Sequence, residues 1–309
     1  MTRARPPLPA RARRAALTLG CLLAGLLASV GPARAAAPFG LYVGSATSGG
    51  ITPIDLASNT TGSAIAMLAP AAVVISADGS IAWAANDTAG TVTPVDLATG
   101  GAGTPITVGT NPQAIALAPD GRTAYVVNAG SDTVTPINLA TRTAGTPITV
   151  GTNPHAIAIA PDGGTAYVVN AGAGTVTPIA LESGTTGTPI AVGSAPSGIA
   201  ISPDGNTAYV ANEGSDTVTP IDLDTHTPGP PIAVGGGPVG VAVTPDGSTL
   251  FVTDFTAGTV TPISLDTNTA GSPITVGSDP TGIAITPDGR RAYVADNGIN
   301  LVTPINGDA

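Results

Sequence analysis

The stretch AIAIAPDGGTAYVVNAG, residues Ala156–Gly172, is apolar on both sides of a Pro-Asp-Gly corner. The same pattern recurs at intervals of 42 residues: AIALAPDGRTAYVVNAG begins at Ala114, and AISPDGNTAYVANEG follows in the same frame from Ala200. Two short apolar runs around such a corner predict a β-hairpin, because aspartate and glycine adopt the conformations that a tight turn needs. The chain therefore repeats one hairpin at a fixed interval.

The repeat runs through most of the chain. One aromatic residue marks each copy, with spacings of 41 and then five times 42 residues: Tyr42, Trp83, Tyr125, Tyr167, Tyr209, Phe251 and Tyr293. The copy from Ala114 contains four short apolar segments, AIALA, TAYVV, TVTPINL and TPITV, and no window has helical periodicity. Four antiparallel strands in a repeat of this length are typical of a propeller blade. The predicted fold class is an all-β propeller with blades of about 42 residues.

The first strand of each unit has one branched and one small face. The branched positions are Val73, Ile115, Ile157, Ile199, Val241 and Ile283, and each follows a small residue: Ala72, Ala114, Ala156, Gly198, Gly240 and Gly282. Successive residues of a strand point to opposite faces, so branched side chains of one blade can fill the space beside small residues of the next. Space is scarcest near the axis of a ring, and we therefore expect this strand to be innermost.

Two features depart from a regular propeller. The third strand of each unit carries a proline, whose backbone has no N–H to donate to the neighbouring strand. We therefore expect the outer strand to be short or bulged opposite these prolines: Pro53, Pro94, Pro136, Pro178, Pro220, Pro262 and Pro304. The second and third strands occur seven times, but the repeat begins without a first strand and stops at Asn306 without a fourth. Seven blades with two incomplete terminal blades are predicted, and six full blades are the alternative.

Residues 1–35 have the features of a secretory signal peptide, and residues 36–309 form the predicted propeller. A basic start is followed by the apolar run Ala15–Val30 and by the cleavage pattern Ala33-Arg34-Ala35. Arg13-Arg14 leaves a twin-arginine export route open beside the general one. The apolar run is too short for a membrane span, and no later segment is comparable. We expect a secreted or extracytoplasmic protein, with attachment to the cell surface left open.

Cleavage after Ala35 would remove the only cysteine and six of the ten basic residues. Four arginines and all twenty acidic residues would remain, and 4 minus 20 gives a net charge of −16. Nucleic-acid binding depends on lysine and arginine at phosphates, so a nucleic-acid partner is not expected. Without cysteine the exported domain has no disulfide, and its apolar core must hold it together.

The second strands carry a family resemblance. Tyr-Val-Val-Asn at 125 and 167, Tyr-Val-Ala-Asn at 209, Phe-Val-Thr-Asp at 251 and Tyr-Val-Ala-Asp at 293 each follow a Pro-Asp-Gly turn. The pattern resembles the bacterial YVTN β-propeller repeat and covers residues 41–306. The resemblance implies a seven-bladed propeller, usually exported or on the cell surface, with relatives that include lactonases and cofactor-bearing propellers. It assigns no reaction to this chain, because function depends on sites added to a fold.

The most variable register of the repeat lies just before the first strand. Directly after a shared proline stand Ala71, Gln113, His155, Ser197, Val239 and Thr281; two residues earlier stand Ala69, Asn111, Asn153, Ala195, Gly237 and Asp279. The start of the innermost strand should bring this register to the mouth of the central channel. The candidate ligand-binding residues are Asn111, Gln113, Asn153, His155, Ser197, Asp279 and Thr281. Neutral variation in an exposed loop is the alternative interpretation.

Other acidic residues give weaker signals. Asp222, Asp224 and His226 are spaced two residues apart, so on a strand they would share one face and could bind a metal ion. The pattern Asp-Leu-x-Thr is common to the repeats, however, so we expect no metal site. The aspartates of the Pro-Asp-Gly turns are explained by turn formation. A further acidic set should lie in the loops of the mouth face and would favour a cationic or neutral polar partner: Asp87, Asp132, Glu213, Asp216, Asp254 and Asp296.

The sequence favours a non-enzymatic binding or protein-interaction module that uses the mouth face. Its expected partner is a small polar ligand, a glycan or a protein, and no cofactor or catalytic residue is assigned. The first alternative is a lactonase-like or lyase-like enzyme at the same mouth, using His155 and a carboxylate such as Asp279. The second alternative is a passive cell-surface or matrix protein.

Overall fold

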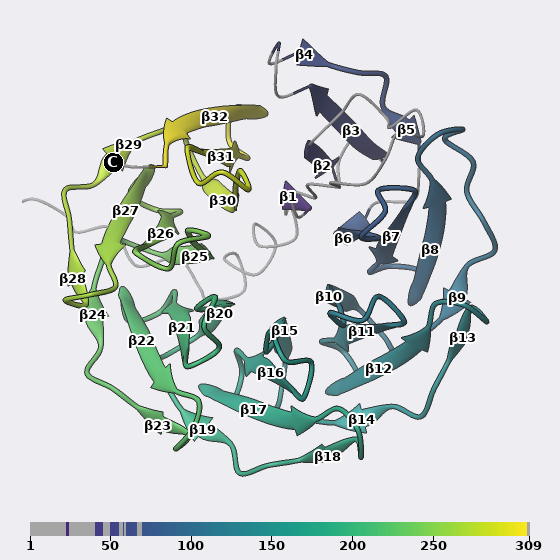
Figure 1. The fold of residues 1–309 in the computed structure, drawn as a ribbon, viewed down its shortest axis with the longest axis horizontal. Coiled ribbons are helices and arrows are strands. Elements are labelled where there is room, and N and C mark those ends of the chain that lie inside the picture. The colour runs from purple at the N-terminus through teal and green to yellow at the C-terminus, as the bar shows by residue number, and fades with distance from the viewer. Residues whose placement is uncertain are drawn as a thin grey trace, which may run out of the picture.

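The computed structural model describes residues 23–24, 41–45, 50–55, 58, 60–66 and 70–307. Within them the chain forms β-strands and turns without a helix, and the strands build seven antiparallel sheets around one axis (Figure 1). The sheets are numbered as blades 1 (β1–β5), 2 (β6–β9), 3 (β10–β14), 4 (β15–β19), 5 (β20–β24), 6 (β25–β29) and 7 (β30–β32). The prediction of an all-β, seven-bladed propeller is confirmed, and the six-bladed alternative is excluded.

Each blade runs from the axis to the rim in chain order (Figure 1). The inner strands are β1 (Leu23–Ala24), β6 (Pro70–Ile75), β10 (Pro112–Leu117), β15 (Pro154–Ile159), β20 (Pro196–Ile201), β25 (Pro238–Val243) and β30 (Pro280–Ile285). The second strands are β2 (Leu41–Ser45), β7 (Ile81–Asn86), β11 (Thr123–Asn128), β16 (Thr165–Asn170), β21 (Thr207–Asn212), β26 (Thr249–Asp254) and β31 (Arg291–Asp296).

The outer half of each blade consists of one regular strand and short pieces. The third strands are β3 (Gly50–Asp55), β8 (Thr91–Asp96), β12 (Thr133–Asn138), β17 (Thr175–Ala180), β22 (Thr217–Asp222), β27 (Thr259–Ser264) and β32 (Leu301–Asn306). The rim pieces are β4 (Thr60–Thr61), β5 (Ile65–Ala66), β9 (Ile106–Thr107), β13 (Thr143–Ala144), β14 (Ile148–Thr149), β18 (Thr185–Thr186), β19 (Ile190–Ala191), β23 (Thr227–Pro228), β24 (Ile232–Ala233), β28 (Thr269–Ala270) and β29 (Ile274–Thr275).

The prolines divide the outer strand, as predicted. In blade 3, Pro136 lies opposite Tyr125 in an unbroken β11–β12 register. The rim piece β13 pairs with the last two residues of β12, and β14 pairs with its first two. Between them the Pro136 carbonyl still accepts a bond from the Gly145 amide at 2.7 Å, but no strand residue pairs with the middle of β12 on its outer side. Proline has no amide hydrogen to offer there, and splitting the outer strand removes the need for one.

The inner strands interlock as the alternation of branched and small residues predicts. Ala72 and Ile115 belong to one apolar cluster, Ala114 and Ile157 to the next, and Ala156 and Ile199 to a third. Each pair joins the small face of one blade to the branched face of its neighbour. Burial of apolar surface between blades therefore holds the ring together.

The first and last blades differ from the others. Among the described residues, blade 7 consists of the three strands β30–β32 without an outer strand. In blade 1 the inner position is taken by β1, whose residues Leu23 and Ala24 pair with Val43 and Tyr42. These residues lie within the segment 1–35, for which a signal peptide is predicted, and cleavage after Ala35 would leave that position open. The described part of the chain contains no helix with the length and hydropathy of a membrane span.

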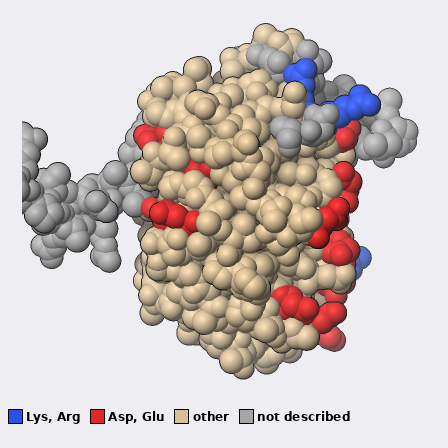
Figure 2. Space-filling view, turned by 90° about the vertical axis from the view of Figure 1, so that its left-hand side faces the viewer, with Lys and Arg blue, Asp and Glu red and all other residues tan. Residues whose placement is uncertain are grey.

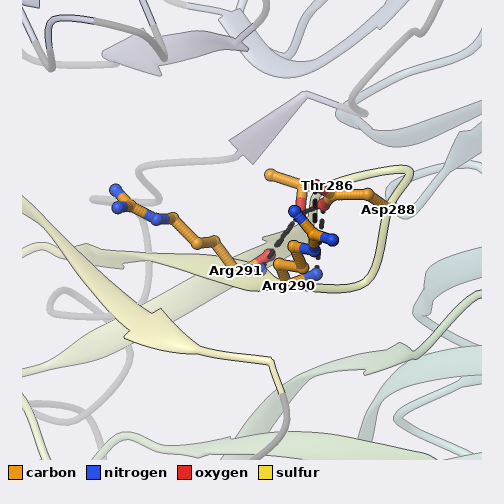
Figure 3. A network of polar contacts seen from close by, with 4 residues as sticks. All are labelled: Thr286, Asp288, Arg290 and Arg291. Carbon is orange, nitrogen blue, oxygen red and sulfur yellow. Dashed lines mark hydrogen bonds and ion pairs between the residues drawn. The ribbon is translucent and has the colours of Figure 1, made fainter.

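The Pro-Asp-Gly aspartates hold turns together. Asp288 accepts hydrogen bonds from the Thr286 hydroxyl (2.6 Å) and the Arg290 amide (3.1 Å), while its other oxygen lies 4.0 Å from the Arg290 side chain (Figure 3). The equivalent bonds from Thr244 and Ser248 lower the pKa of Asp246 to about 2. Gly289 follows at a φ of 72°, a conformation that glycine adopts without strain. These carboxylates are therefore occupied by their own turns.

Candidate functional site

The predicted mouth face is built by two sets of loops that bind each other. In blade 4, the amides of Ala171 and Gly172, which follow β16, donate to the carbonyls of Asn153 and Thr152, which precede β15, at 3.0 and 3.1 Å. Equivalent bonds join Ala129 and Gly130 to Asn111 and Thr110 in blade 3. These bonds fix the chain just before each inner strand, where the candidate register lies.

Backbone conformation explains the first part of the candidate register. Asn111, Asn153 and Asp279 have φ values of 54°, 49° and 53°, in the left-handed region. Asparagine and aspartate tolerate this region better than most residues, so the turn alone accounts for their side-chain type. Asn111 and Asn153 are exposed and Asp279 is half-buried, and these three side chains remain accessible at the mouth.

Gln113 and His155 occupy the bulge at the start of adjacent inner strands. The β10–β11 register shifts between Pro112 and Ala114, and the β15–β16 register shifts between Pro154 and Ala156. Both side chains are half-buried. The Gln113 amide donates to Asn111 Oδ1 at 2.7 Å, which leaves the carbonyl oxygen of Gln113 available. Desolvation lowers the pKa of His155, and no hydrogen bond contributes to that pKa.

Ser197 and Thr281 are engaged within the protein. Ser197 is buried, and its hydroxyl donates to the Pro238 carbonyl of the next blade at 2.9 Å. The Thr281 hydroxyl donates to the Ala295 carbonyl at 3.3 Å, and its own carbonyl accepts a bond from Thr253 at 2.7 Å. The expectation that all polar side chains of this register face one ligand therefore needs correction. The bulge turns these two hydroxyls toward neighbouring backbone.

Several acids assigned to the mouth have structural roles. Asp254 and Asp296 are almost completely buried. Asp132 accepts a bond from the Asn153 amide at 2.7 Å, and Asp216 accepts one from the Gly237 amide at 2.8 Å. Figure 2 views the ring edge-on and shows acidic side chains along its two faces, at the left and right of the view, with few on the rim between them. The surface charge thus follows the loops of both faces.

Glu213 is a further mouth residue that the predicted ligand set did not include. It follows β21, its side chain is half-buried, and desolvation raises its pKa. The equivalent positions of blades 3 and 4 hold Ala129 and Ala171, so the change from alanine to a carboxylate was the available sequence signal. Glu213 belongs to the blade beside that of His155. Asp279 belongs to blade 7, across the ring from β15 (Figure 1).

The metal pattern at Asp222, Asp224 and His226 has another explanation. Asp222 ends β22 and accepts bonds from the amide and hydroxyl of Thr225, which closes a turn rather than extending a strand. His226 Nε2 lies 3.1 Å from the Tyr167 hydroxyl of the preceding blade. Within the described ranges, no group of three histidine, cysteine or acidic side chains is arranged to hold a metal ion.

The comparison with protein families supports the architecture. Residues 149–303, half of the chain, match the family model described as lactonase, 7-bladed beta-propeller. The chain belongs to this family. Membership is consistent with the resemblance found in the repeats, and it leaves the reaction open because one fold supports many sites.

Solved structures show the same fold. Hydrazine synthase of Kuenenia stuttgartiensis superimposes with a TM-score of 0.81 over 88% of this chain and 94% of that chain, at 22% identity. A functionally unknown protein from Desulfotomaculum acetoxidans superimposes with a TM-score of 0.75 over 84% of this chain and 90% of that chain, at 16% identity. At these identities the likeness concerns the fold alone. The comparison with curated proteins gives no match.

The shifted pKa of His155 gives a first prediction. The chain contains two histidines, so two imidazole signals should be resolved in a proton NMR titration, and His155→Ala assigns them. Because burial lowers the pKa of His155, its signal should titrate below about 6.5, the usual value. Above that pH His155 is neutral in the folded and unfolded states. As the pH falls below it, the folded protein must bury a charged imidazole, so the free energy of unfolding should decrease. A midpoint at or above 6.5 would contradict this assignment.

Proposed function

We propose that the chain is a binding module whose mouth face holds a neutral, hydrogen-bonding ligand at Gln113 and His155. The observation that carries this proposal is the half-buried imidazole of His155, whose pKa is lowered by desolvation alone. A neutral imidazole offers one donor and one acceptor. The inner strands β10 and β15 contact each other, so the Gln113 carbonyl is on the neighbouring blade.

The accessible groups suggest the class of ligand. Asn111, Asn153, Gln113 and neutral His155 supply amide and imidazole groups without a positive charge. Such groups suit hydroxyl-bearing or amide-bearing ligands, including glycans, and suit phosphate poorly. Ser197 is left out of the proposed site because its hydroxyl is buried against Pro238.

Equilibrium binding tests this proposal. The protein is titrated calorimetrically with a panel of sugars and small amides, and we expect at least one to bind. Replacing Gln113 and His155 together by alanine should weaken that ligand about tenfold or more, as expected when two hydrogen-bonding partners are lost. Arg122→Ala, an exposed change on the opposite face, should leave affinity unchanged. Equal affinity in the double variant would place the site elsewhere.

Hydrolysis of a lactone is the second candidate function. It is favoured by the family match and by the pKa shifts of His155 and Glu213. In both side chains burial favours the neutral form. A neutral imidazole can accept a proton from water, as a general base does. In a screen of lactones, turnover that His155→Ala abolishes would support this function. Turnover unaffected by that change would exclude His155 as the base.

A further inference from the structure

A groove of about 750 Å³ lies at the outer rim between blades 3 and 4. Blade 3 contributes Tyr125, Pro136 and the rim piece β14, while blade 4 contributes the turn from Leu181 to Thr186. β14 and β18 lie side by side at this part of the rim (Figure 1). The groove is thus remote from the axis and separate from the proposed mouth site.

Between blades 4 and 5 the equivalent groove is filled by a side chain. His226 of blade 5 occupies the repeat position of Gly184, and both have a left-handed backbone, with φ values of 55° and 68°. The His226 ring lies edge-on to Tyr167, the counterpart of Tyr125, with ring centroids 5.8 Å apart and planes at 74°. Its Nε2 atom lies 3.1 Å from the Tyr167 hydroxyl.

Burial follows this position around the ring. Where it holds a side chain, the neighbouring isoleucine is buried: Arg142 with Ile106 (7% exposed), His226 with Ile190 (5%) and Asn268 with Ile232 (9%). Where it holds Gly184, Ile148 is only half-buried, and so is Pro136, whereas its counterpart Pro178 is buried. Gly100 is a second glycine at this position, and its neighbour Ile65 is likewise only half-buried. The missing side chain at Gly184 therefore contributes to the open groove by leaving Ile148 uncovered.

The groove has polar groups at the same repeat positions as those around His226. Glu182 lines the groove at the repeat position of Asp224. Burial and the charges of Asp162 and Asp224 raise the pKa of Tyr167, which places Asp224 near the filled counterpart. The pKa of Tyr125 is raised by burial and by Asp120, with no contribution from a hydrogen bond. The Tyr125 groove thus offers a hydroxyl and a carboxylate to a ligand with ring N–H groups.

We propose that the Tyr125 groove binds an imidazole ring edge-on, with a ring nitrogen hydrogen-bonded to the Tyr125 hydroxyl. The ring comes from a small imidazole compound or from a histidine side chain of a partner peptide. We infer an imidazole as the ligand because the His226 ring packs against Tyr167 in the equivalent place. Glu182 further favours a ring that carries N–H donors.

Tyrosine-selective NMR tests the proposal. The chain has five tyrosines, so protein labelled with ¹³C at the ring ε carbons should give five resolvable signals, and Tyr125→Phe assigns that of Tyr125. Imidazole and the tripeptide Gly-His-Gly serve as probes, and Gly-Ala-Gly serves as the control. Imidazole should shift the Tyr125 signal saturably. A matching shift with Gly-His-Gly identifies a peptide histidine as a ligand, and its absence restricts the site to small molecules.

Exchanging the two turn residues gives matched variants. Gly184→His should supply an internal ring and weaken imidazole binding at Tyr125 at least tenfold. His226→Gly should open a second groove, so that the Tyr167 signal also responds, and glycine suits this left-handed position. The proposal is overturned if imidazole leaves the Tyr125 signal unmoved, or if the response is equal in Gly184→His. A silent Tyr167 in folded His226→Gly would also contradict it.

Discussion

Gly240→Ala is expected to destabilise the propeller by about 3 kcal/mol or more, at the upper end of overpacking effects. A Cβ atom at this position would overlap the carbonyl oxygen of Thr281 on the next inner strand and would lie 2.8 Å from Thr253 Oγ1. The carbonyl belongs to backbone and cannot rotate away. β25 and β30 would have to separate near the axis, where the blades are closest.

Gly198 makes the same approach to the following blade. A Cβ there would overlap the carbonyl oxygen of Val239 and would lie 3.4 Å from a methyl group of Val241. Gly198→Ala should therefore resemble Gly240→Ala. In blades 2 to 4 the same register holds Ala72, Ala114 and Ala156, so the inner strands are spaced to accept a methyl group there.

Urea unfolding measures both effects, and a neighbouring glycine provides the control. A Cβ at Gly236 would have Thr256 Cβ as its nearest neighbour at 3.7 Å, an ordinary contact, and its φ is not in the left-handed region. Gly236→Ala should leave the midpoint nearly unchanged, while Gly198→Ala and Gly240→Ala lower it. Equal midpoints for all three variants would show that the inner strands can separate without cost.

The blade architecture was predictable because the residue pattern that produces it recurs in every repeat of the sequence. Alternating branched and small residues around Ile115 and Ile157 fix which strand is innermost, since this pattern can be buried only against another copy. Pro136 and its counterparts similarly predict an interrupted outer strand, because a missing donor acts locally. The inner position of blade 1 could not be predicted, since β1 precedes the repeat and shares none of its pattern.

The candidate site was predicted less well, because register alone does not determine side-chain direction. Gln113, His155, Ser197 and Thr281 share one position, yet Ser197 is buried against the next blade while His155 is half-buried. The bulge and the neighbouring residues set these directions. The Tyr125 groove was also hidden, since Gly184 lies 59 residues from Tyr125 in sequence and opens the groove only when the blades meet.

Asp254→Asn and Asp296→Asn are expected to stabilise the protein at neutral pH by about 1 kcal/mol or more each, as expected when a buried charge is replaced by a hydrogen-bonded amide. Blades 2 to 5 have asparagine here, and Asn128 Nδ2 donates to the hydroxyls of Thr133 (3.2 Å) and Thr135 (2.9 Å). Asp254 instead accepts bonds from Thr259 (2.8 Å) and Thr261 (2.6 Å). Asp254→Asn can reuse the arrangement of the other blades, whereas Asp296→Asn keeps Thr303 as a partner but has Leu301 at the position of Thr133.

The stabilisation should depend on pH. Desolvation raises the pKa of both Asp254 and Asp296, against the opposing effect of their hydrogen bonds. Below the unfolded value of about 3.9 each carboxyl is neutral in both states, so it carries no penalty. As the pH rises through the folded pKa, the native state must bury a charge that the unfolded state exposes to water, and stability is lost. The advantage of asparagine should therefore grow with pH and then level off.

Urea unfolding of the two variants and the parent chain from pH 4 to pH 8 tests this expectation, with the reverse substitution in blade 5 as the matched control. Asn212 makes the same bonds to Thr217 and Thr219, at 3.2 and 2.9 Å. Asn212→Asp should destabilise the protein by a similar amount at neutral pH and recover as the pH falls toward 4. If the asparagine variants differ from the parent by the same amount at every pH, the carboxyls are not the cause. If both are less stable than the parent at neutral pH, the ionised carboxylates make stronger bonds to their threonines than the amide does, and the burial argument fails.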